Sequence, residues 1–229
     1  MKPFFTYYGG KYRSIGKYPK PEHDCVVEPF AGSAGYSVRH NAKRVVLCDL
    51  DPIICGIWSY LTKVSERELM SLPNLELGQS IDTLSVNQEA KWLIGFWVNK
   101  GSSQPKKTLS KWATKHPNFF WGDTVKARLA SQVHQIRHWE VYQVSYRDCP
   151  VPGNATWFID PPYQIAGKHY RFGSKGINYL DLGDWCRSRK GLTLVCENLG
   201  ADWLPFQFLG DFKTSRRGIK SAEVIWTNQ

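Results

Sequence analysis

Four residues in a row, Asp160, Pro161, Pro162 and Tyr163, follow a short hydrophobic run in this 229-residue chain. The run "ATWFI" predicts a buried strand that delivers Asp160 to its carboxyl end. Prolines have no N–H to donate, so they end the strand in a stiff corner and leave its carbonyls free as acceptors. A carboxylate, a carbonyl and an aromatic face suit a planar base with an exocyclic amine. We therefore interpret the tetrapeptide as a base-binding site rather than as a proline turn alone.

A glycine-rich turn provides the second group of candidate residues. "CVVEPF" (25–30) predicts a strand and "AGSAG" (31–35) a turn in which glycine lets the backbone approach a ligand closely. Asp49 closes the next predicted strand, seventeen residues after Gly32, which is similar to the spacing at which an acid meets ribose hydroxyls in nucleotide-binding sheets. Because the full GxGxxG pattern is missing, the turn alone leaves open an adenosine-containing ligand or a structural turn.

The elements that position these residues alternate between strands and helices, which predicts an α/β fold with a parallel sheet. Ligands of such sheets bind beyond the carboxyl ends of the strands, where the strand order reverses. Both motifs stand at such ends. The predicted strands cover 25–30, 44–51, 140–146, 155–160, 192–198 and 222–228, and the predicted helices 36–42, 53–64 and 124–139.

The middle of the chain has a different composition. Residues 62–140 are polar, basic and rich in tryptophan, and 99–123 combines loop-forming Gly, Ser and Pro with lysines typical of an anion-binding surface. We expect a sheet domain built from residues 1–61 and 141–229, with 62–140 as an inserted recognition region.

Charge favours a polyanionic partner. The chain has 30 Lys and Arg against 20 Asp and Glu, a net charge of +10, and the basic residues occur in blocks. Such blocks attract nucleic acid, although many basic proteins bind none. No apolar run is long enough to cross a membrane or to act as a leader, so we expect a cytoplasmic protein without a membrane partner.

Metal binding is not indicated. The six cysteines are scattered with no CxxC pair, and we expect reduced thiols that bind no metal. His134 and His138 share one helical face, but the sequence offers no third ligand beside them.

Taken together, the motifs resemble those of the Dam-type DNA adenine-N6 methyltransferases, whose signature is a DPPY tetrapeptide after a hydrophobic strand. The resemblance covers most of the chain in the order that this family uses. It includes "YYGGK" (7–11), "VVEPFAGSAG" (26–35), "LCDLD" (47–51), "YRDC" (146–149), "FIDPPY" (158–163), "VCEN" (195–198) and "AEVIWTN" (222–228). Tyr7 stands where the family usually has Trp, the second glycine of the turn is shifted to Gly35, and Cys149 replaces an aromatic residue.

The resemblance implies a Rossmann-like methyltransferase sheet with a mostly helical, basic recognition region, and S-adenosylmethionine as cofactor. The catalytic residues would be Asp160, Pro161, Pro162 and Tyr163. The cofactor pocket would contain Tyr7, Gly10, Lys11, Glu28, Phe30, Ala31, Gly32, Asp49, Asp148, Cys149 and Asp160.

The implied reaction is site-specific methylation of N6 in an adenine flipped out of double-stranded DNA. Asp160 and the Pro161 carbonyl would accept the two amine hydrogens, and Tyr163 would stack on the base. We expect phosphate contacts from Lys100, Lys106, Lys107, Lys111, Lys115, Arg216 and Arg217. Trp112, Phe119, Phe120 and Trp121 are interpreted as core residues rather than intercalating ones.

Other acceptors and roles remain open. RNA adenine and cytosine N4 are alternatives that keep the chemistry, and a catalytically silent nucleic-acid-binding relative is an alternative from another class. A protein-glutamine methyltransferase is less favoured, because position 160 is Asp rather than Asn. We expect a monomer from a prokaryote or phage, either solitary or part of a restriction-modification pair.

Overall fold

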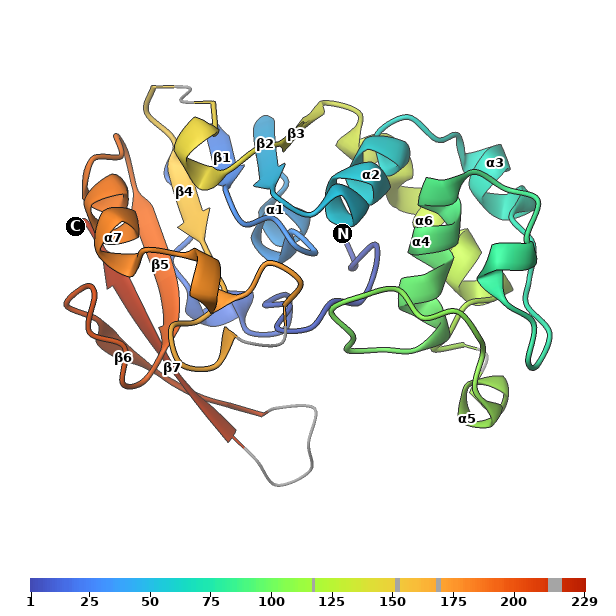
Figure 1. Cartoon of the computed structure of the whole chain (residues 1–229). Coiled ribbons are helices and arrows are strands. Elements are labelled where there is room, and N and C mark those ends of the chain that lie inside the picture. The colour runs from blue at the N-terminus through green and yellow to red at the C-terminus, as the bar shows by residue number, and fades with distance from the viewer. Residues whose placement is uncertain (117, 151–152, 168–169, 214–219) are drawn as a thin grey trace.

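A mostly parallel sheet forms the centre of the protein. The structure, a computed structural model, describes residues 1–116, 118–150, 153–167, 170–213 and 220–229. These residues form a seven-stranded sheet in the order β3-β2-β1-β4-β5-β7-β6, in which only β7 runs antiparallel to its neighbours (Figure 1). The strands are β1 (Cys25–Glu28), β2 (Arg44–Asp49), β3 (Trp139–Gln143), β4 (Thr156–Ile159), β5 (Thr193–Asn198), β6 (Gln207–Lys213) and β7 (Lys220–Thr227).

This arrangement confirms the predicted Rossmann-like α/β fold class. From β1 the chain builds the sheet outward through β2 and β3, and from β4 it builds in the opposite direction through β5. The strand order therefore reverses between β1 and β4, which pair in parallel. Ligands of open α/β sheets bind beyond the carboxyl ends of the strands at such a reversal.

Helices cover both faces of the sheet, as the buried side chains show. Val27 and Val46, aligned across β1 and β2, point to the face that α7 (Tyr179–Arg187) covers. Val26 and Val45 point to the other face, where the N-terminal segment, α1 (Gly35–His40) and α2 (Pro52–Leu61) pack. Because the central strands are buried on both faces, their sequences are nearly continuous hydrophobic runs.

The inserted region is helical, as predicted, and lies to one side of the sheet (Figure 1). Its helices are α3 (Glu66–Ser71), α4 (Gln88–Val98), α5 (Lys111–Thr114) and α6 (Asp123–Val133). Side-chain oxygens cap the amino ends of three of them: Ser65 for α3, Asn87 for α4 and Ser110 for α5. Shorter 3-10 turns lie at Ile15–Lys17, Ile81–Thr83, His134–Ile136, Tyr146–Asp148 and Ser174–Gly176.

One hydrophobic cluster joins the helical region to the sheet. Leu47 of β2 and Trp58 of α2 belong to the same cluster as Leu93 of α4 and Leu129 of α6, and all four side chains are fully buried. The sheet and the inserted helices thus share a core, while their division into two domains remains a prediction.

Two elements differ from the sequence predictions. The helix expected over 124–139 ends at Val133, because Trp139 instead pairs with Val45 as the first residue of β3 and is buried in the core. β6 was not predicted. It is an edge strand with a bulge near Gly210, and the side chain of Phe208 is exposed, so its sequence lacks a regular hydrophobic pattern.

In the described parts of the chain, no helix combines the length and apolar character that a membrane span requires.

The shared core predicts that sheet and inserted helices unfold together. Thermal unfolding followed by circular dichroism and by tryptophan fluorescence should give a single coincident transition. Leu93→Ala should lower the free energy of unfolding by about 2–5 kcal/mol in both signals, because it leaves a cavity in the common cluster. Leu180→Ala, at a side chain that is 72% exposed, serves as the control and should change little. Two separate transitions would show that the regions are independent.

Candidate active site

The glycine-rich turn and Asp160 meet at the carboxyl edge of the sheet. The turn follows β1 and Asp160 follows β4, and these strands are neighbours. A pocket between the two motifs contains most of the residues predicted for cofactor binding: Tyr7, Gly10, Lys11, Glu28, Phe30, Ala31, Gly32 and Asp160. Residues that were not predicted to bind the cofactor also line it: Tyr8, Gly9, Ser33, Gly35, Phe158 and Tyr170.

Lys11 is the central charge of this site. Its side chain is 9% exposed, and its Nζ lies 3.2 Å from Oδ1 of Asp160 and 3.5 Å from Oε2 of Glu223. The same ammonium group lies 4.6 Å from the ring centre of Tyr163. Lys11 therefore links the N-terminal segment to the end of β4 and to β7.

The charges of this cluster shift the pKa of each partner. Burial alone would lower the pKa of Lys11, but the carboxylates of Asp160 and Glu223 outweigh burial and raise that pKa above its usual range. Burial raises the pKa of Asp160, and Glu223 raises it further, while Lys11 opposes both effects. Lys11 thus keeps its charge and favours the ionised form of Asp160, against the effects of burial and of Glu223.

Tyr163 is fixed at both ends of its ring. Its hydroxyl donates a hydrogen bond to Oε2 of Glu223 at 2.5 Å, and Ser221 donates to the other oxygen of Glu223 at 3.3 Å. The ring packs against the hydrophobic cluster that includes Ile15 and Tyr18. With Lys11 over the ring, Tyr163 is held as part of the ionic cluster.

The corner after β4 is held by the side chain of Glu197. One carboxylate oxygen of Glu197 accepts hydrogen bonds from the Gln164 N–H at 2.9 Å and from Nε1 of Trp203 at 3.2 Å. The hydroxyl of Tyr179 donates to the Pro162 carbonyl. Among the described residues, no hydrogen bond reaches the carbonyl of Pro161, a buried residue that does not line the pocket.

The glycine-rich turn is fixed by neighbours on both sides. Gly32 has a φ of 45°, and a Cβ at this position would come within 3.1 Å of the Tyr7 ring. Its N–H donates to Oδ2 of Asp49 at 2.9 Å, and its carbonyl accepts from Nε1 of Trp58 at 2.9 Å. Glycine is therefore required here both for its backbone conformation and for space.

Two acids, the buried Glu28 and the half-buried Asp49, flank this turn. Burial raises the pKa of Glu28 to about 8, although the hydrogen bonds from Ser37, whose N–H lies 2.7 Å from Oε1, oppose the shift. Burial also raises the pKa of Asp49 to about 6, against the N–H donors of Asp51 and Gly32. Asp49 is therefore mostly ionised at neutral pH.

The chemistry of these residues fits the adenosyl part of S-adenosylmethionine. Asp49, which binds the turn without lining the pocket, is an acceptor suited to ribose hydroxyls, and the turn at Gly32 permits close approach. The half-buried ring of Phe30 supplies an apolar surface, and it stacks on Tyr146 with ring centres 5.5 Å apart.

The free space, however, is small. The cavity volume is about 40 Å³, whereas ligand pockets usually measure roughly 300–1,000 Å³. Tyr170 narrows the opening: its hydroxyl donates to the Tyr8 carbonyl at 3.4 Å, and its ring centre lies 6.0 Å from that of Tyr7. A ligand as large as S-adenosylmethionine fits this pocket only if lining residues such as Tyr170 move.

Asp148 and Cys149 do not line this pocket. Asp148 ends the 3-10 turn that follows β3 and is exposed. Cys149 is 3% exposed and belongs to the cluster on the α7 face of the sheet. Their role in cofactor binding remains a prediction from the resemblance.

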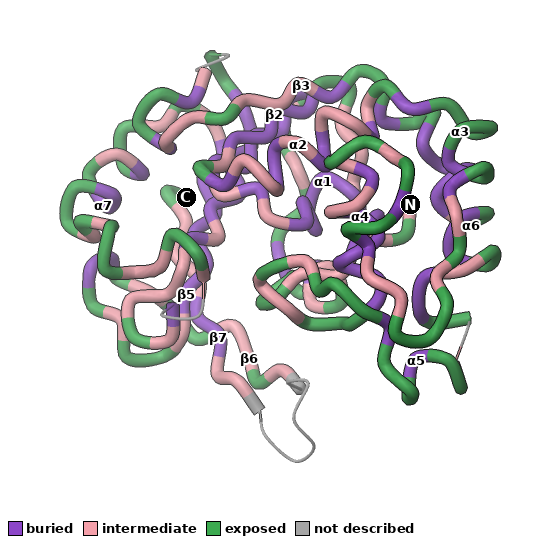
Figure 2. The backbone as a smooth tube through the Cα atoms, turned by 45° about the vertical axis from the view of Figure 1, so that its right-hand side comes forward, coloured by how far each residue is buried: buried purple, intermediate pink, exposed green. Residues whose placement is uncertain are grey.

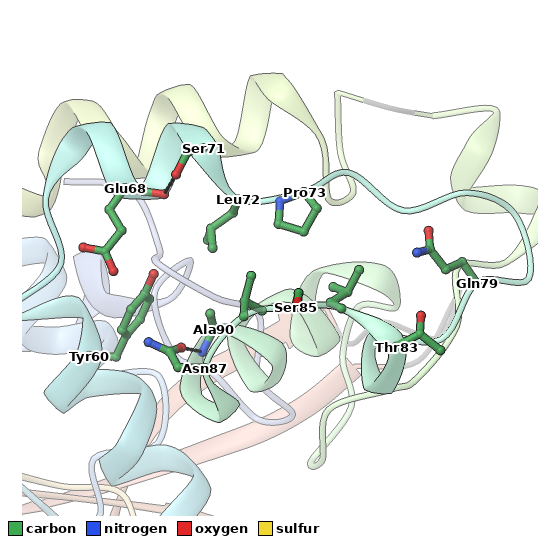
Figure 3. A pocket seen from close by; sticks show the side chains of 12 residues that line it. Tyr60, Glu68, Ser71, Leu72, Pro73, Gln79, Thr83, Ser85, Asn87 and Ala90 are labelled. Carbon is green, nitrogen blue, oxygen red and sulfur yellow. Dashed lines mark hydrogen bonds between the residues drawn. The ribbon is translucent and has the colours of Figure 1, made fainter.

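A larger cavity lies elsewhere, in the helical region. It has a volume of about 540 Å³ and is lined by residues near α3 and α4, including Tyr60, Glu68, Leu72 and Asn87 (Figure 3). No residue of the glycine-rich turn or the DPPY tetrapeptide lines it. The smaller pocket therefore remains the candidate active site.

The predicted DNA-contacting lysines are exposed on the helical region. Four of them form no ion pair with the described residues: Lys100, Lys106, Lys111 and Lys115. The fifth is paired, because Nζ of Lys107 lies 2.6 Å from Oδ2 of Asp82. The predicted contacts of Arg216 and Arg217 lie outside the described residues.

The prediction that four aromatic residues of this region are core residues is half wrong. Phe120 and Trp121 are buried, at 3% and 4% exposure, but Trp112 and Phe119 are each 62% exposed. Phe120 and Trp121 belong to the core cluster shared with the sheet, whereas that cluster does not include Trp112 or Phe119.

The histidines and cysteines form no metal site in the described chain. Nδ1 of His134 lies 3.2 Å from Glu66 Oε1, whereas Nε2 of His138 lies 3.0 Å from the Ala42 carbonyl, so the two rings have different partners. All six cysteines are buried and free.

Sequence reasoning missed Glu223, Glu197 and Tyr170. Glu223 and Glu197 each stand inside a hydrophobic strand sequence, "AEVIW" and "LVCEN". An acid in a strand that is otherwise apolar is rarely buried unless it is paired, and that signal was present in the sequence. Tyr170 lacks any comparable signal.

Comparisons with known proteins add little to this geometry. No family model and no curated protein matches the sequence. Among solved structures, a conserved hypothetical protein of Streptococcus pyogenes matches with 11% identity and a TM-score of 0.40, over 97% of this chain and 95% of that one. A Haemophilus influenzae protein described as a "putative methylase" matches with 12% identity and a TM-score of 0.36, over 89% and 78% of the two chains. Neither similarity supports a conclusion about activity. Any inference about activity therefore rests on the sheet order and on the site.

Glu28 predicts a specific pH dependence of stability. Its pKa rises from an ordinary 4.5 to about 8 on folding, so its contribution to stability is complete below pH 4.5 and is lost as pH rises through about 8. Glu28→Gln keeps an acceptor for the Ser37 N–H and removes this loss. Chemical unfolding is measured at several pH values over that range. The free energy of unfolding of Glu28→Gln should increase with pH relative to that of the unmodified protein, by at most about 1.4 kcal/mol per pH unit. A difference that is constant with pH would contradict the burial of an ionisable Glu28.

Proposed function

We propose that this protein is an S-adenosylmethionine-dependent DNA methyltransferase that modifies N6 of adenine. One observation carries the proposal: the Asp160 carboxylate lies at the strand-order reversal, directly before Pro161 and next to a glycine-rich turn and an acid suited to an adenosyl group. S-adenosylmethionine, when bound, supplies an electrophilic methyl group.

Asp160 and Pro161 act on the amine of the base. The adenine N6 lone pair is delocalised into the ring, which makes the nitrogen a poor nucleophile. Two acceptors that bind the two amine hydrogens favour a pyramidal nitrogen and localise that lone pair. They also stand where positive charge develops on nitrogen, which is the most effective place for fixed acceptors.

The ionic cluster favours this charge development. At their formal charges, Asp160, Glu223 and Lys11 sum to one negative charge, and the first two lie 3.2 and 3.5 Å from Lys11. Lys11 orients Asp160 and favours its ionised form, while Glu223 prevents the lysine from cancelling the negative potential. The cluster thus presents a fixed acceptor whose surroundings remain negative overall.

Tyr163 contributes by position. Its ring carries Lys11 on one side and its hydroxyl is bound by Glu223. A base that stacks on this ring uses the remaining exposed area or displaces the ammonium group. Tyr163 therefore contributes mainly by positioning Glu223 and Lys11. Stacking on the base is its second contribution.

The charge distribution supports nucleic acid as the substrate. The net charge is +10, and Lys100, Lys106, Lys111 and Lys115 are exposed without an acidic partner among the described residues. Phosphate contacts of this kind position a duplex without reading its sequence. Double-stranded DNA is the substrate that the resemblance of the DPPY tetrapeptide favours.

The test is the identity of the methylated nucleoside. Purified protein is incubated with S-adenosylmethionine and unmethylated plasmid DNA, and the digested nucleosides are analysed by mass spectrometry. We expect N6-methyladenine with the unmodified protein. Asp160→Asn should reduce it by a hundredfold or so, because a neutral amide oxygen is a weaker acceptor than the carboxylate and does not offset the positive charge that develops on nitrogen. Asp184→Asn, at a side chain that is 80% exposed on α7, is the matched control and should retain full activity.

Each other outcome has a defined meaning. N4-methylcytosine alone would keep the fold and cofactor but reject adenine as the base. Methylation of RNA alone would reject DNA. Absence of both products together with absence of cofactor binding would favour a catalytically silent nucleic-acid-binding protein.

A further inference from the structure

Two large aromatic side chains, seven residues apart in the sequence, are exposed on the helical region. Trp112 of α5 and Phe119, which follows this helix, are each 62% exposed. Figure 2 shows α5 as one of the most exposed segments of the chain. Burying either ring would contribute roughly 1.5–3 kcal/mol of hydrophobic free energy, so their joint exposure indicates a binding surface.

Neighbouring groups contact the Trp112 ring and the backbone of Phe119. The Trp112 ring meets the buried Phe120 edge-on, with ring centres 5.2 Å apart, and lies 4.5 Å from the ring of His116. The Phe119 N–H donates to the His116 carbonyl at 3.0 Å. Phe120, at 3% exposure, anchors this segment in the core. The two exposed rings are therefore presented by an ordered support.

Unpaired positive charges surround the rings. Nζ of Lys100 lies 5.2 Å from the ring centre of Phe119, and Lys111 and Lys115 are exposed on and next to α5. No described acid pairs with these three lysines. Burial lowers the pKa of Lys100, and the positive charges of Arg128 and Arg13 lower it further. A phosphate at this position would relieve that repulsion.

The backbone of α5 lies on the same side of the sheet as the carboxyl ends of the strands, where the candidate active site stands (Figure 1). In Figure 1, α5 extends beyond the carboxyl ends of β2 and β4, and the far ends of β6 and β7 extend on the same side. A duplex that presents a base to Asp160 approaches from this side.

We propose that Trp112 and Phe119 stack on DNA bases exposed when the target adenine leaves the duplex, while Lys100, Lys111 and Lys115 bind the adjoining phosphates. The choice of a duplex with a flipped adenine rests on the proposed function. The combination itself follows from chemistry: aromatic faces stack on any base, and lysines follow the backbone. A protein partner with an apolar face would not account for three unpaired lysines.

The salt dependence of DNA binding distinguishes the contribution of aromatic stacking from that of the lysine charges. Dissociation constants for a fluorescently labelled DNA duplex are measured over a series of salt concentrations. Trp112→Ala and Phe119→Ala should each weaken binding on the order of tenfold without changing the slope of log K against log salt, because no phosphate contact is lost. Lys111→Ala should instead reduce that slope by about one.

Matched controls exist for both changes. Leu180→Ala removes an apolar side chain that is 72% exposed on α7. Lys43→Ala removes a lysine that is 80% exposed at the opposite edge of the sheet, immediately before β2. Both should leave binding and its salt slope close to those of the unmodified protein. Thermal unfolding and S-adenosylmethionine binding of all variants should also match it, which excludes a folding defect.

The outcomes distinguish this inference from the proposed function. If Trp112→Ala and Phe119→Ala bind DNA as Leu180→Ala does, the inference is overturned even if adenine methylation is found. If they lose affinity for single-stranded RNA but not for duplex DNA, the assignment to a duplex is overturned. If they lose DNA affinity as predicted but no methylated base forms, the stacking surface stands and the proposed function fails.

Discussion

The ammonium group of Lys11 is the contact on which the candidate site depends. It lies between the carboxylates of Asp160 and Glu223 and over the ring of Tyr163. These residues come from the N-terminal segment, the corner after β4, and β7. The carboxylates of the buried Glu223 and the half-buried Asp160 would repel each other so close together, and the desolvation of each would be costly. Without Lys11, the corner that carries the DPPY tetrapeptide would hold uncompensated charge.

The sheet makes this contact possible. Parallel pairing of β1 and β4 brings the glycine-rich turn beside Asp160, and antiparallel β7 carries Glu223 back to the same edge. Glu197 of β5 fixes the corner through the Gln164 N–H. Hydrophobic burial determines the strand order, and the strand order then brings together charges that are far apart in sequence. In Figure 1, α5 of the inserted region lies beyond this edge of the sheet, on the same side as the candidate site.

Much of this arrangement could be predicted from the sequence, for identifiable reasons. Strands such as β2 and β5 are buried on both faces, so they appear as short apolar runs ending in polar residues. Local motifs located the glycine-rich turn and the corner after β4. Glu223 could not be assigned, because its partner Tyr163 is sixty residues away in sequence and no local pattern connects them. The exposure of Trp112 and the closure of the pocket by Tyr170 likewise depend on tertiary packing that spacing does not encode.

The titration of Asp160 tests the central claim most directly. It can be followed by carbon NMR with aspartate labelled at the side-chain carboxyl, and assigned by comparison with Asp160→Asn. The account predicts that the pKa of Asp160 lies above the ordinary aspartate value and falls in Glu223→Gln, because that variant removes a negative neighbour while Lys11 remains. An ordinary pKa that does not change in Glu223→Gln would show that the three charges do not form the buried cluster on which the proposed chemistry rests.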